Sequence, residues 1–166
     1  MQYAWTGPKN PEDHDALSRW VSQKSFGNPE NIWPDSSGCG ILKDGRPLAG
    51  FIFHDFKPSA GTVQFSGAAT NPEWVKGPSL HYLYSYMFDG LGCQMVTTGN
   101  APDNKRLHRL LEKTGHRKYI IERGWGRHED MFFWTLTQEQ WLENPLMQRS
   151  RKWAEELRNV KSTKTD

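Results

Sequence analysis

Side chains able to move protons lie at two places in the sequence. His54 and Asp55 lie together at the end of a predicted strand, and His128 lies in a Gly-rich segment shortly before a second apolar run. An imidazole, with an ordinary pKa of about 6.5, can accept or donate a proton near neutral pH. His54 alternates with apolar neighbours, so an ordinary surface position is the alternative to a catalytic one. The candidates for a general base are His54, Asp55, Glu122, His128 and Asp130.

A candidate anion site is the loop Lys76-Gly77-Pro78-Ser79, which opens onto a predicted helix at Leu80. Backbone N–H groups at a helix N-terminus bind phosphate, and glycine lets a ligand approach the backbone closely. Proline presets the first helical turn, and Lys76 adds positive charge. These features predict a phosphate-binding turn. The alternative is a Pro-Gly loop capped by Ser79.

The clearest helix signal spans residues 104–116. Leu107, Leu110 and Leu111 recur at helical spacing, which predicts an amphipathic helix with one core-facing stripe. Asp103 or Asn104 precedes it as an N-cap, and Gly115 follows it as a C-terminal glycine. Apolar runs flank the segment, so we expect a β-α-β unit.

This segment resembles the last helix of the GNAT N-acetyltransferases, whose usual pattern is N-x-x-S-x-x-x-x-E-K-x-G-F. Asn104, Glu112, Lys113 and Gly115 fall on register, whereas Leu107 replaces the small residue and His116 replaces the phenylalanine. The resemblance is nearest to the ribosomal-protein and small phage-encoded acetyltransferase branches, and it covers roughly residues 38–141.

The resemblance implies acetyl-CoA as the acyl donor. Its pyrophosphate would contact the Lys76–Ser79 loop, although the family signature Q/R-x-x-G-x-G/A has Trp74 in place of the leading polar residue. Asn104 would touch the pantetheine arm or the thioester. The 3′-phosphate would meet Lys105 or Arg109, for which a solvated charged face is the alternative. The arm itself would pair with an open strand edge made of Ser66, Gly67, Ala68 and Ala69.

One tyrosine that some family members use as an acid is missing, because Leu111 and Glu112 occupy its neighbourhood. Protonation of the leaving thiolate is therefore not assigned to a residue. The loop 25–38, with Trp33 as its anchor, is a candidate lining of the site.

The element order supports an α/β (α+β) class with one GNAT-like domain at residues 1–145, followed by a C-terminal helix and frayed tail at 146–166. We expect a mixed, mostly antiparallel sheet with helices on both faces. Asn10 should cap the first helix. Predicted helices cover 11–23, 80–91, 104–116, a short segment after Thr137, and 146–160; predicted strands cover 39–43, 47–56, 62–70, 93–98, 118–123 and 131–136.

The composition limits the classes of function that the chain can have. The chain has 166 residues and a net charge of +2, so nucleic-acid binding is possible but not favoured. Cys39 and Cys93 are expected to be reduced thiols, no metal-ligand spacing occurs, and no apolar run suits a membrane span or a signal peptide. These features predict a cytoplasmic protein without a metal. Aromatic residues in the tail are compatible with a homodimer.

The resemblance and the site residues together predict an N-acetyltransferase that uses acetyl-CoA. Its acceptor would be a primary amine on a protein, on a small molecule or on aminoacyl-tRNA. One alternative is a catalytically inactive GNAT-like module that binds a partner protein or nucleic acid. Another is the same chemistry directed at a modified nucleic-acid base.

Overall fold

The structure is a computed structural model that describes residues 1–30 and 32–162, with side chains described up to residue 160. The chain forms two compact units. The first comprises residues 1–57 and 63–76, and the second comprises residues 58–62 and 77–166. The part of the expected frayed tail beyond residue 162 lies outside the described residues.

The first unit carries a sheet in the order β1-β2-β3-β4, with one helix against it. Its elements are β1 (Gln2–Thr6), α1 (Pro11–Phe26), β2 (Ser37–Lys43), β3 (Arg46–Lys57), most of β4 (Thr62–Ala69) and the short 3-10 helix η1 (Pro72–Val75). The β1–β2 and β2–β3 pairs are antiparallel. The tight turn predicted at Asp44-Gly45 is confirmed, with φ of 51° and 73°.

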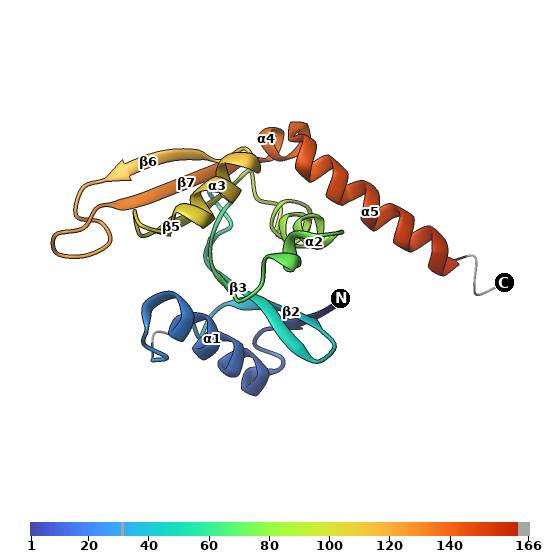
Figure 1. Cartoon of the computed structure of the whole chain (residues 1–166), viewed down its shortest axis with the longest axis horizontal. Coiled ribbons are helices and arrows are strands. Elements are labelled where there is room, and N and C mark those ends of the chain that lie inside the picture. Colours follow the sequence, from blue (N-terminus) through green and yellow to red (C-terminus); the bar gives the residue numbers. More distant parts are fainter. Residues whose placement is uncertain (31, 163–166) are drawn as a thin grey trace. The chain divides into compact units, whose positions relative to one another are not determined.

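Helix α1 packs against β2 and β3 (Figure 1). It extends three residues beyond the predicted end and stops at Gly27, whose φ is 69°. Asn10 is the N-cap residue of α1, as predicted, and its carbonyl oxygen accepts a hydrogen bond from the His14 N–H at 3.0 Å, but its side chain does not bond the helix. Instead, the Asn10 Oδ1 accepts a hydrogen bond from the Gly7 N–H at 2.8 Å, because the turn before the helix needs an acceptor.

The second unit carries strands in the order β5-β7-β6 and most of the helices. Its elements are α2 (Ser79–Ser85), the π-helical turn η2 (Tyr86–Gly90), β5 (Met95–Asn100), α3 (Lys105–Lys113), β6 (Arg117–Ile121), β7 (Met131–Thr137), α4 (Gln138–Glu143) and α5 (Pro145–Ser162). The predicted helix 80–91 is therefore α2 followed by a wider turn. Strands β6 and β7 form the predicted closing hairpin (Figure 1).

The local signals at the helix ends of this unit are confirmed. Asn104 caps α3, since its Oδ1 accepts a hydrogen bond from the Leu107 N–H at 3.2 Å. Gly115 follows α3 with a φ of 87°. Thr137 and Gln140 form a capping box at the start of α4. The seven described strands and their helices thus match the predicted α/β class. The strand pairs β1–β2, β2–β3, β5–β7 and β6–β7 are antiparallel.

Cys39 and Cys93 are buried and free, as expected. None of the helices in the described part of the chain is long and apolar enough to cross a bilayer. Among residues 1–30 and 32–162, no group of three or more His, Cys, Asp or Glu side chains is arranged to hold a metal ion.

Candidate active site

His54 lies in β3 and connects two other polar side chains of the first unit. Its Nδ1 lies 2.7 Å from Oδ2 of Asp55, and its Nε2 lies 2.9 Å from Oγ of Ser66 in β4. A carboxylate can only accept a hydrogen bond, so Nδ1 carries the proton that Asp55 accepts. In the neutral ring Nε2 is then an acceptor, and the Ser66 hydroxyl donates to it. Hydrogen bonds thus run from Ser66 to His54 and from His54 to Asp55.

The backbone at Asp55 explains how two neighbouring residues of one strand can meet. Successive side chains of a regular strand point to opposite faces. Asp55 has a φ of 51°, in the left-handed region that aspartate tolerates better than most residues. This local reversal lets its carboxylate reach the imidazole of His54, while 67% of the Asp55 side chain stays exposed.

The His54 ring is buried beneath Trp33. The residue His54 is only 6% exposed, and the two rings stack with centroids 5.3 Å apart and planes 24° apart. Burial lowers the pKa of the His54 imidazole below its ordinary value, and the Asp55 carboxylate partly opposes this shift. The ring is therefore neutral at neutral pH, as a proton acceptor must be.

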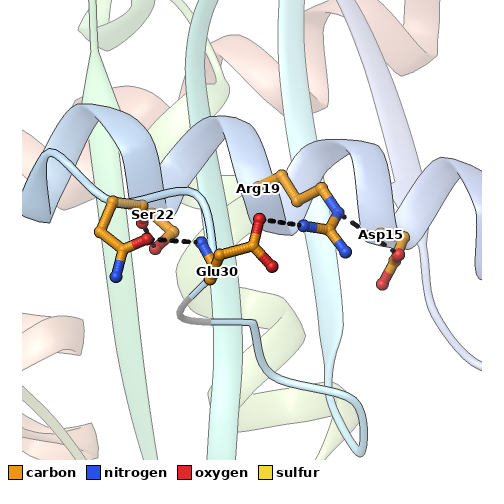
Figure 2. A network of polar contacts seen from close by, with 5 residues as sticks. Asp15, Arg19, Ser22 and Glu30 are labelled. Carbon is orange, nitrogen blue, oxygen red and sulfur yellow. Dashed lines mark hydrogen bonds and ion pairs between the residues drawn. The ribbon is translucent and has the colours of Figure 1, made fainter.

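The segment that carries Trp33 is anchored to α1. The backbone N–H of Trp33 donates a hydrogen bond to Oγ of Ser18 at 3.2 Å. Arg19 forms ion pairs with Asp15, at 3.6 Å, and with Glu30, at 2.9 Å (Figure 2). Two neighbouring residues of α1, Ser18 and Arg19, therefore hold the loop at Trp33 and at Glu30.

Gly67 of β4 has a packing role that the sequence did not indicate. A Cβ on Gly67 would lie 2.5 Å from a ring carbon of Phe51, so that ring fills the space a side chain would need. Ala68 is half-buried and Ala69 is exposed. Glycine at position 67 is therefore required by the core of the first unit, whether or not a ligand binds this strand.

Trp74, which replaces the family's polar residue, is a core side chain. It lies in η1, is 7% exposed, and packs on Phe51 with ring centroids 4.9 Å apart. Next to it, Glu73 forms an ion pair with Lys43 at 2.6 Å. This departure from the signature therefore has a structural cause within the first unit.

The turn before α2 is held by a residue of α5. Gly77 has a φ of 71°, and no described heavy atom lies within 4 Å of the position that a Cβ would take. Ser150 donates its hydroxyl to the Gly77 carbonyl at 2.9 Å and accepts a hydrogen bond from the His81 N–H at 3.0 Å. Pro78 has no N–H, so two of the backbone donors that a phosphate could use near this turn are absent or occupied.

The remaining predicted ligand-binding residues lie on α3. Asn104 uses its oxygen to cap the helix, which leaves its amide nitrogen as the group for a ligand. Lys105 and Arg109 are exposed in the first two turns. His108, absent from the predicted apolar stripe, is buried and lies 3.0 Å from the Ala101 carbonyl oxygen through Nε2.

His116, which replaces the family's phenylalanine, is buried in the second unit. Its Nδ1 lies 3.0 Å from the Thr114 hydroxyl, and its Nε2 lies 3.2 Å from the Tyr84 hydroxyl. Thr114 donates its own proton to the carbonyls of α3, so it accepts from Nδ1. Burial lowers the pKa of His116 to about 3. This histidine is a neutral core residue, not a proton carrier at neutral pH.

Two residues of the predicted base set, His54 and Asp55, belong to the first unit, and the other three belong to the second. His54 and Asp55 are in contact in the first unit. His128 is exposed, in the β6–β7 connection of the second unit. In that same connection Asp130 accepts a hydrogen bond from the Arg123 N–H at 3.0 Å, and Glu122 pairs with the Arg123 side chain at 3.8 Å.

The resemblance implies ligand binding for Ser66, and its contact with His54 is an additional finding of the structure. In a hairpin, residues at equal distances from the turn lie opposite each other. For the turn at residues 58–61, this places position 54 opposite a residue next to position 66, so the sequence does indicate that the two positions are close. The sequence predicts Trp33 as an anchor, but residue type alone does not indicate that it covers the His54 ring. Ser150 had no local signal, because its partner lies 73 residues away.

Similarity to known proteins is found in structure and not in sequence. No protein-family model matches the sequence, and no curated protein matches it. A GCN5-related N-acetyltransferase from Brucella melitensis is similar in structure, with a TM-score of 0.66, 16% identity, and coverage of 92% of this chain and 82% of its own. The chain has the GNAT fold. The predicted fold class is thereby confirmed.

Other structures with the GNAT fold have similarly low identity. A spermidine N-acetyltransferase variant from Vibrio cholerae has a TM-score of 0.62 and 11% identity, with 86% of this chain and 98% of that chain covered. Against another acetyltransferase the chain spans 63% of the other protein's length, with a TM-score of 0.59 and 17% identity over 70% of this chain. These likenesses establish the fold, so the activity has to be argued from the site.

Proposed function

We propose that this chain transfers an acetyl group from acetyl-CoA to a primary amine. The observation that carries the proposal is the buried, neutral His54, held between Asp55 and a half-exposed Ser66 on a strand of the GNAT fold. Attack of an amine on a thioester releases a proton, and His54 accepts it. Asp55 stabilises the imidazolium that forms and keeps the ring in one orientation.

Two residues of the proposed acetyl-CoA site suit an anionic ligand by themselves, since Lys76 is exposed and Gly77 is left-handed, whereas Ser79 is fully buried. When bound, this co-substrate supplies an activated acyl group. Gly77 lies in a left-handed turn with open space at its Cβ position. The Trp74 indole packs on Phe51 in the core of the first unit. We assign the pyrophosphate to Lys76, Gly77, Pro78 and Ser79, the pantetheine arm to Ser66–Ala69 and Asn104, and the 3′-phosphate to Lys105 or Arg109.

Thermal stabilisation by acetyl-CoA tests binding. A ligand that binds the native state at about 100 times its Kd stabilises it by about 2.7 kcal/mol, which raises Tm measurably. We expect this increase for the wild type and a smaller one for Gly77→Val, because a β-branched residue strains a turn with a φ of 71°. Gly126→Val is the matched control, since Gly126 does not have a positive φ and no neighbouring heavy atom is closer than 3.6 Å to its Cβ position.

Turnover is measured separately as the release of free thiol in the presence of amines. Stabilisation without thiol release would support the inactive binding module instead. An unchanged Tm at saturating acetyl-CoA would contradict the proposal, because specific binding to the native state must stabilise it.

The acceptor amine remains open among a protein, a small amine and aminoacyl-tRNA. One structural neighbour is a spermidine N-acetyltransferase, which makes a polyamine a reasonable first amine to assay. An exposed Asp55 carboxylate would also attract a cationic amine. The nearness to ribosomal-protein and phage-encoded branches, the cytoplasmic location and the homodimer stay predictions, as does the domain boundary at residue 145.

A further inference from the structure

We propose that Ser66 is the residue that contacts the acceptor amine and relays its proton to His54. The inference rests on the acetyl transfer proposed above and deepens it. In that reaction His54 is the final proton acceptor, and the relay places the Ser66 hydroxyl between the imidazole and the amine nitrogen.

The proton-accepting atom of His54 is already occupied. A neutral imidazole has one lone pair for hydrogen bonding, and the contact of Nδ1 with Asp55 at 2.7 Å leaves that lone pair on Nε2. The Ser66 hydroxyl donates to Nε2 across 2.9 Å. An amine N–H therefore cannot reach this lone pair unless it displaces the hydroxyl.

Direct access to the His54 ring is also restricted on its other sides. The residue is 6% exposed, and the ring is stacked on Trp33 with centroids 5.3 Å apart. A rotation that turned Nε2 toward solvent would break both this stacking and the hydrogen bond to Asp55. The ring therefore accepts a proton through the group that it already contacts.

Ser66 has the groups that a proton relay needs. A hydroxyl has one proton to donate and two lone pairs that accept. Among the described residues, His54 is the one hydrogen-bond partner of the Ser66 hydroxyl, and it takes the proton. Because Ser66 is half-buried and not buried, its oxygen can accept a hydrogen bond from an amine that comes from solvent.

The exposure of the partners distinguishes His54 from a histidine that is only packed in a core. The two hydroxyl partners of the buried His116 are just 1% and 5% exposed. By contrast, both partners of His54 reach solvent: the Asp55 side chain is 67% exposed, and Ser66 is half-buried. A buried ring whose partners are open to solvent is what a proton path from the surface requires.

The proton transfers balance. As the neutral amine nitrogen attacks the thioester carbonyl carbon and forms an N–C bond, Ser66 Oγ takes a proton from nitrogen and passes its own proton to His54 Nε2. The C–S bond breaks with its electron pair on sulfur. His54 then returns the proton through Ser66, and the thiolate leaves as a thiol. Ser66 forms no bond to carbon, so the amine attacks the thioester directly.

Diethyl pyrocarbonate tests access to His54 without acetyl-CoA, because it acylates imidazole nitrogens that carry an accessible lone pair. In the wild type we expect His54 to react more slowly than the exposed His128, with each site quantified by mass spectrometry. In Ser66→Ala the Nε2 lone pair loses its partner, so His54 should react several-fold faster while His128 is unchanged. Equal rates at the two histidines in the wild type would overturn the relay, because an amine could then reach Nε2 directly.

Turnover in mixtures of light and heavy water tests whether two protons move in one step. The assay uses a slowly acetylated amine, so that proton transfer limits the rate. For the wild type, kcat/KM should depend on the deuterium fraction along a curve, as expected for two protons in flight. In Ser66→Ala this dependence should become linear, and kcat/KM should fall by about 10²-fold, which is the lower end of what proton transfer by a positioned side chain contributes.

Two further variants separate the relay from a loss of packing. Ser66→Thr keeps the hydroxyl, so it should keep the curved dependence and most of kcat/KM. Ser85→Ala is the matched control, since Ser85 is also half-buried but donates to the Tyr82 carbonyl. Its kcat/KM and its curve should equal those of the wild type.

The outcomes separate this inference from the proposed function. A linear dependence for the wild type, or an unchanged kcat/KM in Ser66→Ala, overturns the relay and leaves the acetyltransferase standing. The wild-type curve and the wild-type modification rates decide this even if a variant fails to fold. If the wild type releases no thiol from acetyl-CoA with any amine, the proposed function fails and the relay fails with it.

Discussion

Two residues that depart from the GNAT pattern are both core side chains. Trp74 replaces a polar residue and packs on Phe51, and His116 replaces a phenylalanine and bonds Tyr84 and Thr114. Neither substitution therefore argues by itself against acetyl transfer. A buried histidine that stays neutral instead affects stability. The unfolded chain can bind a proton at this residue and the folded chain cannot, so the folded state becomes less stable as pH falls.

His116→Phe should flatten the dependence of stability on pH. The pKa of His116 is about 3 in the folded chain and about 6.5 when unfolded, so the unfolded state binds more protons between these values. Stability of the wild type therefore falls as pH falls from about 6.5 toward 3. Chemical denaturation between pH 7.5 and 4.5 should show a smaller loss in the variant.

At pH 7.5 the same variant should be less stable by about 1–3 kcal/mol, because it removes the buried hydrogen bonds of the imidazole to Tyr84 and Thr114. Tyr84→Phe is the control: it removes one of these hydrogen bonds but keeps the imidazole, so its pH dependence should stay as steep as in the wild type. Parallel curves for the wild type and His116→Phe would show that this ring is not the titrating group.

At this scale the sequence predicted local contacts and missed those that depend on register. The Asn104 cap involves the next three residues, so its spacing alone indicated it. The contact between His54 and Ser66 depends on the pairing of two strands and on a left-handed Asp55, neither of which follows from residue type. These are the contacts on which the candidate site depends.

At the scale of elements, periodicity recovered the helices because their buried faces are mostly apolar. It was less informative for α1, whose buried face includes His14, Ser18 and Ser22. His14 bonds Thr6 and Ser36, and Ser18 bonds the Trp33 N–H, so these polar groups are buried with partners. A pattern that counts only apolar residues cannot find such a face.

Helix α5 is attached to α2 by more than apolar contact. Ser150→Ala removes the hydroxyl that bridges the Gly77 carbonyl and the His81 N–H. We expect a loss of about 1–3 kcal/mol in the free energy of unfolding, since a partly buried donor is left without its acceptor. Hydrogen exchange should locate the effect, with faster exchange of the His81 amide.

Ser85→Ala is the matched variant for this measurement. Its hydroxyl donates to the Tyr82 carbonyl at a longer distance of 3.4 Å, so its removal should cost less. Equal costs for the two variants, or unchanged exchange at His81, would mean that the Ser150 hydroxyl does not hold α5 in place and that other contacts, such as those of the buried Met147 and Ala154, do.

At the scale of the whole molecule, β6 is an edge strand with unusually exposed apolar side chains. It ends the order β5-β7-β6, and Tyr119, Ile120 and Ile121 are 50%, 62% and 41% exposed. An edge strand also presents unpaired backbone donors and acceptors, whereas the exposed face of α5 presents side chains only. Self-association should therefore use β6 more than the tail.

Ile120→Lys should reduce concentration-dependent association, because a charge on an edge strand opposes pairing with a second strand. Light scattering coupled to size exclusion should show a mass closer to the 19.2 kDa of one chain than the wild type gives at the same concentration. Leu157→Lys is the control on α5, where the side chain is 48% exposed. Both substitutions are on the surface and should change stability by no more than about 0.5 kcal/mol. A reduced mass in Leu157→Lys but not in Ile120→Lys would place the contact on the tail, as the sequence alone suggested. A wild type that stays monomeric at all concentrations measured would exclude both surfaces.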